Sequence, residues 1–320
     1  MQPLAGTLVV DFTRYLPGAY ATRELNRLGA RVVRVEPPAG DPMRPTATAW
    51  DTALRAGSES VTCELPSDAI FAQALCARAD VVLEGFRPGV AASLGVGPDD
   101  VPASTVYCSI TGFGDGGPHR RRAGHDVNYL GWAGALEDTA PQLPPVQIAD
   151  LAAGALGAVT QVLAGLLERA RTGCGQRIVV SMTDRAHDLV AHRLGGEPVP
   201  RLLTGGLACY RIYETADGRH LTVGALEPKF FNRLCTLVDR SDLAERQYDL
   251  NQEALAAELA SVFGARTLAD WLAHFDDEDV CVGPVSTREE AAAAFGLPKA
   301  PTEVQLGAHT DAWRAELGVR

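Results

Sequence analysis

The chain has 320 residues, of which 46% are hydrophobic and 22% are charged. This composition is typical of a compact globular protein of about two domains, and it excludes disordered, collagen-like and coiled-coil chains. With 29 basic against 40 acidic residues the formal net charge is −11, which disfavours nonspecific binding to nucleic acid or to an anionic membrane surface.

Cysteine spacing and apolar runs indicate the compartment. The seven cysteines are odd in number and never spaced as CxxC, so we expect neither a metal site nor a disulfide scaffold. Residues 1–6 have no basic or apolar segment, and we expect no signal or transit peptide. The longest apolar run, 151–167, is short for a membrane span of about 20 residues. We therefore expect a cytoplasmic enzyme in which this run forms a buried core helix.

Strand and helix patterns alternate along the first half of the chain. Residues 7–12 form an apolar strand, 19–28 a helix ended by Gly29, and 31–36 a second strand, which together predict a βαβ unit. Residues 36–60 are rich in Pro, Gly and Thr and are expected to form a loop. The same alternation continues with helices at 68–77, 151–171 and 183–194 and strands at 81–84, 104–110 and 177–180. The pattern predicts an α/β fold whose large domain has a parallel sheet in a Rossmann-like arrangement.

The composition changes after residue 194. Strand-like residues 209–213 and 220–223 flank an Asp-Gly turn signal and predict a β-hairpin. Helices are expected to begin near Pro228 and to cover residues 252–263 and 268–275. We therefore expect a large domain at 1–194, a smaller α+β domain at 195–294, and a tail at 295–320 that returns to the large domain.

Nucleotide-binding motifs are incomplete. Glu36 ends the second strand, as an acidic residue does in dinucleotide-binding folds, but residues 13–18 after the first strand do not read GxGxxG. Residues 112–118 form a glycine-rich loop, yet neither Lys229 nor Lys299 lies in a glycine loop. A nucleoside triphosphate is therefore a disfavoured substrate.

Four titratable residues stand in contexts that suit a site. His125 and Asp126 follow the glycine-rich loop after a parallel strand, where α/β sheets bind ligands, although a surface pair fits equally well. Asp150 precedes the apolar helix, where it could cap the helix or have a shifted pKa at a partly buried helix end. Glu227 precedes Pro228 and could also be a helix cap. The residues alone leave both interpretations open for each.

Several segments together resemble the class III CoA-transferase family, and the resemblance covers nearly the whole chain. Within that family, further segments are similar to the α-methylacyl-CoA racemase branch. The family segments are PLAG (3–6), LPGA (16–19), LGARVVRVE (28–36), EGFRPG (84–89) and TGFG (111–114); the racemase segments are AGHDVNY (123–129), PP (144–145) with Asp150, YETADG (213–218) and VGALEP (223–228).

The resemblance implies an epimerase that inverts the α-carbon of a 2-methyl-branched acyl-CoA. His125 and Asp150 would exchange the α-proton on opposite faces of the carbon, and Glu227 would hold the imidazole, without metal or cofactor. Family members are interlocked homodimers, so the resemblance implies a site shared between two chains. Two alternatives remain: a CoA-transferase in which Asp150 is acylated, and an inactive homologue that serves as a binding or scaffold subunit.

The chain departs from the family between residues 45 and 66, where the lysines that meet CoA phosphates are missing. Arg34, Arg55 and Arg87 are the expected replacements, since arginine binds phosphate bidentately. Asp126 is expected to contribute to the same substrate-binding site. Because of these missing lysines, a thioester on a carrier protein stays open as the substrate.

Overall fold

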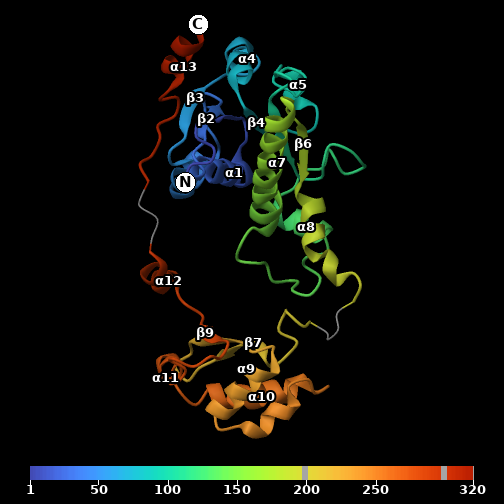
Figure 1. Cartoon of the computed structure of the whole chain (residues 1–320), viewed down its shortest axis with the longest axis vertical. Helices are drawn as coiled ribbons and strands as arrows, with labels where there is room; N and C mark the ends of the chain where they lie inside the picture. The colour runs from blue at the N-terminus through green and yellow to red at the C-terminus, as the bar shows by residue number, and fades with distance from the viewer. Residues whose placement is uncertain (197–200, 297–300, 320) are drawn as a thin grey trace. The chain divides into compact units, whose positions relative to one another are not determined.

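The computed structural model describes residues 1–196, 201–296 and 301–319. These residues form two compact units (Figure 1): the first contains residues 1–192 and 301–319, and the second contains 193–196 and 201–296. The boundaries derived from the sequence fall at 194/195 and 294/295. Each unit is described by itself.

The first unit is built on six parallel strands in the order β3-β2-β1-β4-β5-β6. This is the strand order of doubly wound dinucleotide-binding folds, so the predicted α/β class with a Rossmann-like parallel sheet is confirmed. The strands are β1 (Leu8–Asp11), β2 (Arg31–Glu36), β3 (Glu59–Thr62), β4 (Val81–Glu84), β5 (Val106–Thr111) and β6 (Arg177–Ser181).

Helices connect these strands and cover the sheet. The first of them, α1, begins at Tyr15, four residues earlier than the sequence pattern indicates, and Gly29 follows it with a φ of +102° that glycine adopts easily. The helices of the unit are α1 (Tyr15–Arg27), α2 (Met43–Thr46), α3 (Thr48–Arg55), α4 (Ala69–Arg78), α5 (Val90–Ser93), α6 (Asp126–Trp132), η1 (Ala149–Leu156), α7 (Gly157–Thr172), α8 (Met182–Val190), η2 (Ala191–Arg193) and α13 (Thr310–Leu317).

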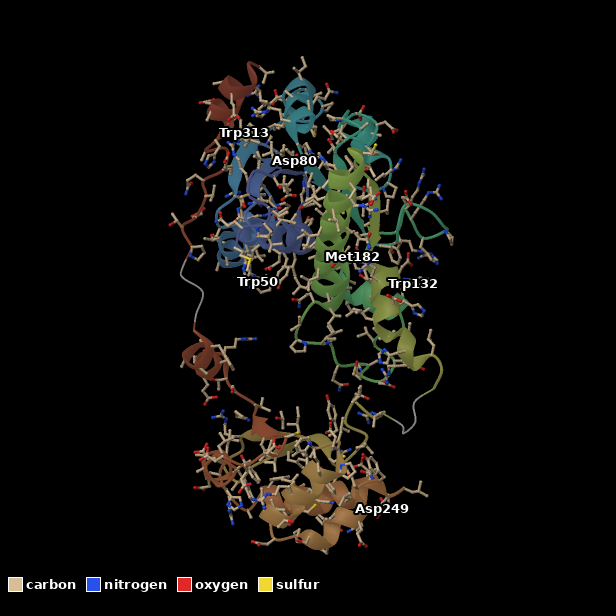
Figure 2. The ribbon with its side chains drawn as sticks, viewed as in Figure 1. Trp50, Asp80, Trp132, Met182, Asp249 and Trp313 are labelled. Atoms are coloured by element: carbon tan, nitrogen blue, oxygen red, sulfur yellow. The ribbon has the colours of Figure 1, made fainter. Side chains whose placement is uncertain are left out.

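Alternating strand residues feed two separate cores. Val9 and its neighbours on that face pack with α1, α7 and α8, whereas the adjacent Val10 packs with α4. The C-terminal α13 lies beside α4 and β3, and its Trp313 is buried in the second of these cores (Figures 1 and 2). The sheet is therefore the middle of three layers, and its strand ends are left to line a site.

The prediction that residues 36–60 form a loop is wrong. This segment contains α2, α3 and the start of β3. Buried ion pairs organise it, because Arg34 on β2 binds Asp51 on α3 with an Nη2–Oδ1 distance of 2.8 Å. Such pairs join residues distant in sequence, and composition does not reveal them.

η1 and α7 form one continuous helix, Ala149–Thr172. Among the described residues it is the one helix that is long and apolar enough to cross a membrane, yet half of its apolar window is buried. Ala153, Ala158 and Val162 lie in the core that covers one sheet face, which agrees with the core helix expected from the sequence. η1 has the wide turns of a π-helix, a geometry often found at functional sites.

The second unit has a three-stranded antiparallel sheet, β7-β8-β9, covered by helices. The predicted hairpin is confirmed, and Gly218 in its turn has a φ of +70°. The short third strand was not predicted. The elements are β7 (Tyr210–Glu214), β8 (His220–Gly224), α9 (Pro228–Leu237), η3 (Ser241–Arg246), α10 (Gln252–Phe263), α11 (Leu268–His274), β9 (Val282–Pro284) and α12 (Arg288–Phe295).

Candidate active site

A pocket of about 300 Å³ opens at the carboxyl ends of β1, β4 and β5. The strand order reverses between β1 and β4, and open α/β sheets bind ligands at such a switch point. Three of the residues singled out in the sequence, Arg87, His125 and Asp150, line this pocket together.

Asp150 is the acidic residue that lines the pocket, and its carboxyl is unusual. It lies inside the first turn of η1, whose N-cap position is held by Ile148, so the helix-cap interpretation is wrong. Its backbone N–H donates to Asp126 Oδ1 at 3.0 Å. Burial, together with the smaller effect of the nearby Asp126 charge, raises the pKa of the Asp150 carboxyl to about 7. A carboxyl that titrates near neutral pH can both accept and return a proton.

His125 immediately precedes α6 at the pocket wall. Its backbone N–H donates to Asn128 Oδ1 at 3.0 Å, which fixes the chain where the helix begins. The ring of Tyr15 meets the imidazole edge to face, with 6.4 Å between ring centroids. Tyr15 has a φ of +63°, a strained value for a tyrosine that is often found at functional sites.

Asp126 does not line the pocket and so does not join the substrate-binding residues. Its effect is indirect, through the hydrogen bond to the Asp150 backbone and the charge beside that carboxyl. The expectation of a direct contact with substrate is therefore replaced by a role in tuning Asp150.

Tyr129 supports the floor of the pocket. A Cβ on Gly112 would come within 2.5 Å of its ring, and one on Gly124 within 2.7 Å, so both positions need glycine. The Tyr129 hydroxyl donates to the Gly124 carbonyl, and burial raises its pKa to about 12. The hydroxyl therefore stays protonated at neutral pH and holds the backbone next to His125.

Four arginines line the same pocket: Arg14, Arg87, Arg120 and Arg122. All four are exposed, and within the described part of the chain none forms an ion pair with a carboxylate. Unpaired guanidinium groups around one partly neutral carboxyl make the pocket electropositive. The arrangement suits an anionic ligand such as a phosphate ester.

Arg34 and Arg55 do not reach this pocket, which corrects the expectation that they bind phosphate. Each is 2% exposed. Arg34 is paired with Asp51, and with Asp41 at 3.1 Å, while Arg55 binds Asp11. Both guanidinium groups are buried and already neutralise buried carboxylates, so they are not accessible to a ligand in the pocket.

Glu36 is similarly engaged within the fold. Its carboxylate accepts hydrogen bonds from Arg44 at 2.7 Å and from Ser60 at 2.7 Å. It is thus occupied by neighbouring side chains, in agreement with the missing GxGxxG motif.

Glu227 belongs to the second unit, apart from the residues of the pocket. It is exposed at the start of α9 and its side chain makes no capping hydrogen bond there. Its carboxylate is therefore not occupied by the helix, and its role stays a proposal.

Comparison with known proteins decides the family. The model of CoA-transferase family III matches residues 4–306. The chain belongs to this family. Human alpha-methylacyl-CoA racemase is 35% identical over 90% of this chain and 78% of its own. The probable fatty acyl-CoA transferase Rv3272 of Mycobacterium tuberculosis is 33% identical over 85% of this chain and 79% of its own.

Solved structures agree with the family and the fold. The crystal structure of Rv3272 from M. tuberculosis has a TM-score of 0.79 at 31% identity, covering 91% of this chain and 85% of its own. A CAIB/BAIF family protein from Brucella suis has a TM-score of 0.81 at 27% identity, covering 98% of this chain and 99% of its own. The relatives of this chain include proteins named as racemases and proteins named as CoA-transferases.

Sequence reasoning missed several residues of the pocket. Arg120 and Arg122 belong to an arginine triplet directly before the AGHD segment, which is a readable signal. Arg14 and Tyr15 follow β1 without any motif, and only the fold brings them to the site. Among the described residues, no group of three or more His, Cys, Asp or Glu side chains could hold a metal ion.

Proposed function

We propose that this member of CoA-transferase family III is an epimerase that inverts the α-carbon of an acyl thioester by two-base proton transfer. The observation that carries the proposal is the shared pocket of His125 and Asp150, in which the Asp150 carboxyl has a pKa of about 7. A group with that pKa is present in both protonation states at neutral pH, as reversible proton transfer requires. The 35% identity to a racemase supports the same reaction.

In the proposed reaction one group removes the α-proton and the other returns a proton to the opposite face. The negative charge that develops on the thioester oxygen would be stabilised by the backbone N–H groups at the N-terminal end of η1. Glu227 would hold the imidazole of His125 in the required orientation. This chemistry needs no metal or redox cofactor, because the thioester itself acidifies the α-proton.

The substrate class follows from the unpaired arginines. Arg87 and Arg14 would bind the phosphates of CoA, because among the described residues no carboxylate pairs with these two side chains. A 2-methyl-branched acyl-CoA is the proposed substrate, and a thioester held on a carrier protein is the alternative carrier.

A CoA-transferase is the second candidate, favoured by the relatives that are named as transferases. In that reaction the Asp150 carboxylate would attack the thioester carbonyl, the carbon–sulfur bond would break and CoA would leave as thiolate, which gives an aspartyl–acyl mixed anhydride. A carboxyl with a pKa near 7 is half protonated at neutral pH, which suits proton transfer better than nucleophilic attack.

Incubation with 2-methylacyl-CoA in deuterated water separates the candidates. Deuterium at the α-carbon together with loss of optical activity supports the epimerase. Exchange of CoA onto a free acid, with an adduct on the Asp150 peptide that hydroxylamine removes, supports the transferase. The absence of both reactions favours the alternative of a binding or scaffold subunit.

A further inference from the structure

Arg122 is held on the pocket wall by two aromatic side chains. Its Nε donates to Nδ1 of His119 at 2.9 Å, and its guanidinium carbon lies 5.2 Å from the ring centroid of Trp132. The two rings also contact each other, with 4.4 Å between centroids. A guanidinium stacked and hydrogen-bonded in this way has lost much of its rotational freedom before any ligand arrives.

The opposite edge of this guanidinium remains available. Arg122 lines the pocket of His125 and Asp150, and within the described residues no carboxylate pairs with it. His119 and Trp132 belong to the wall of the adjoining pocket, of about 550 Å³, and Phe113 lines both cavities. Figure 2 shows Trp132 on the same side of the unit as α8. The Nη1 and Nη2 atoms present the two-pronged donor that carboxylate and phosphate oxygens accept.

We propose that Arg122 forms an anion-binding subsite for a carboxylate at the far end of the acyl chain, so that the substrate is the monothioester of a dicarboxylic acid. This rests on the proposed function, which it deepens. Carboxylate and phosphate share the chemistry that Arg122 recognises, and the position of Arg122 favours the acyl carboxylate. It precedes His125 by three residues, a backbone separation of at most about 11 Å. His125 acts at the α-carbon of the substrate. An extended pantetheine arm holds the CoA phosphates farther from the α-carbon than this separation.

The test compares two substrates of matched shape in the full chain. One is 2-methylglutaryl-CoA with the thioester on the carboxyl next to the methyl-bearing carbon, and the other is 2-methylpentanoyl-CoA. Arg122→Met should raise the KM of the dicarboxylic thioester by about 10- to 100-fold and leave kcat and the KM of the other substrate nearly unchanged. Arg122→Lys should be intermediate, since it keeps the charge and loses the fork. Arg121→Met is the matched control, because Arg121 is exposed in the same triplet and does not line the pocket.

Three results would overturn the acyl-carboxylate subsite. One is a wild-type chain without preference between the substrates, and another is an Arg122→Met variant unchanged with both. The third is an equal rise of KM for both substrates that disappears with the corresponding pantetheine thioesters, which assigns Arg122 to a CoA phosphate. Calorimetric binding of unreactive thioether analogues separates this proposal from the reaction. Preference of the wild type, but not of Arg122→Met, for the dicarboxylic thioether supports the subsite even if no α-proton exchange is found.

Discussion

Proton transfer in the pocket depends on the surroundings of Asp150. Its carboxyl is partly buried, close to the Asp126 charge and not used as a helix cap. Asp150→Asn keeps the shape of the side chain but cannot exchange a proton. We expect epimerisation to fall by about 10²- to 10⁴-fold while thioester binding and the circular dichroism spectrum stay unchanged.

The two bases should also be distinguishable by the configuration of the substrate at the α-carbon. His125→Ala and Asp150→Asn should impair α-proton exchange unequally for the R and S thioesters, because each group serves one face. Proton NMR of the exchange in deuterated water measures both rates. Equal retention of both rates in both variants would exclude a two-base mechanism.

The same carboxyl should make stability depend on pH. A folded-state pKa raised to about 7 means that the folded chain binds this proton more tightly than the unfolded chain. The protonated Asp150 carboxyl therefore stabilises the fold fully below about pH 4, and this stabilisation is lost as the pH rises through about 7. Asp150→Asn removes this dependence. We therefore expect the variant to melt at a higher temperature than the wild type at pH 8, with a smaller difference at pH 4. A lower melting temperature at pH 8 would show that the carboxylate stabilises the fold.

A substitution of Arg87 tests how much the unpaired arginines contribute to substrate binding. Arg87 is exposed on the loop after β4 and lines the pocket. Arg87→Ala should raise the KM for acyl-CoA about tenfold and change kcat little, since a contact remote from the reacting carbon acts equally in ground and transition states. Arg171→Ala, which removes an exposed arginine paired with Glu168, is the matched control. An unchanged KM with a collapsed kcat would contradict this role.

The candidate site could be read from the sequence only where a motif marks it. His125 and Asp150 stand in recognisable segments, and the pocket contains both. Arg34 and Arg55 were assigned to phosphate because arginines commonly bind it, but their partners Asp51 and Asp11 become neighbours only when the sheet forms. Charge partners across such sequence distances have no local signature.

At the scale of elements, periodicity predicted most of the secondary structure. β2, β4 and α10 have the bounds expected from the sequence, because long apolar alternation and helical spacing are local properties. α2 and α3 were missed, since the Pro- and Gly-rich segment around them looks irregular and its helices are stabilised by tertiary ion pairs. Propensity is a weak guide wherever tertiary contacts supply the stability.

Those ion pairs give a prediction that distinguishes a structural from a binding role. Arg34→Met leaves Asp51 buried without its paired cation, and should lower the free energy of unfolding by about 3–5 kcal/mol. Arg78→Met removes an exposed partner of Glu316 and should cost less than about 1 kcal/mol. Urea denaturation measures both. A stable Arg34→Met variant with weakened CoA binding would restore the phosphate-binding role.

At the scale of the whole molecule, the proposed chemistry draws on both units of the chain. His125 and Asp150 belong to the first unit and Glu227 to the second. Family resemblance implies a homodimer in which these groups come from different chains. We therefore predict a dimer by sedimentation at micromolar concentration, and a fully active monomer would contradict it.

Complementation tests whether such sites are shared. In a mixed dimer of Asp150→Asn and Glu227→Gln chains, one shared site combines Asp150 with Glu227 of the partner subunit and is intact, while the other carries both substitutions. Coexpression should therefore restore about a quarter of wild-type activity, because about half of the dimers are mixed and each has one working site. Sites formed within single chains would each keep one defect, and coexpression would then restore no activity. A mixture of Asp150→Asn and His125→Ala chains is the control, because both residues lie in the first unit and no mixed dimer can regain an intact site.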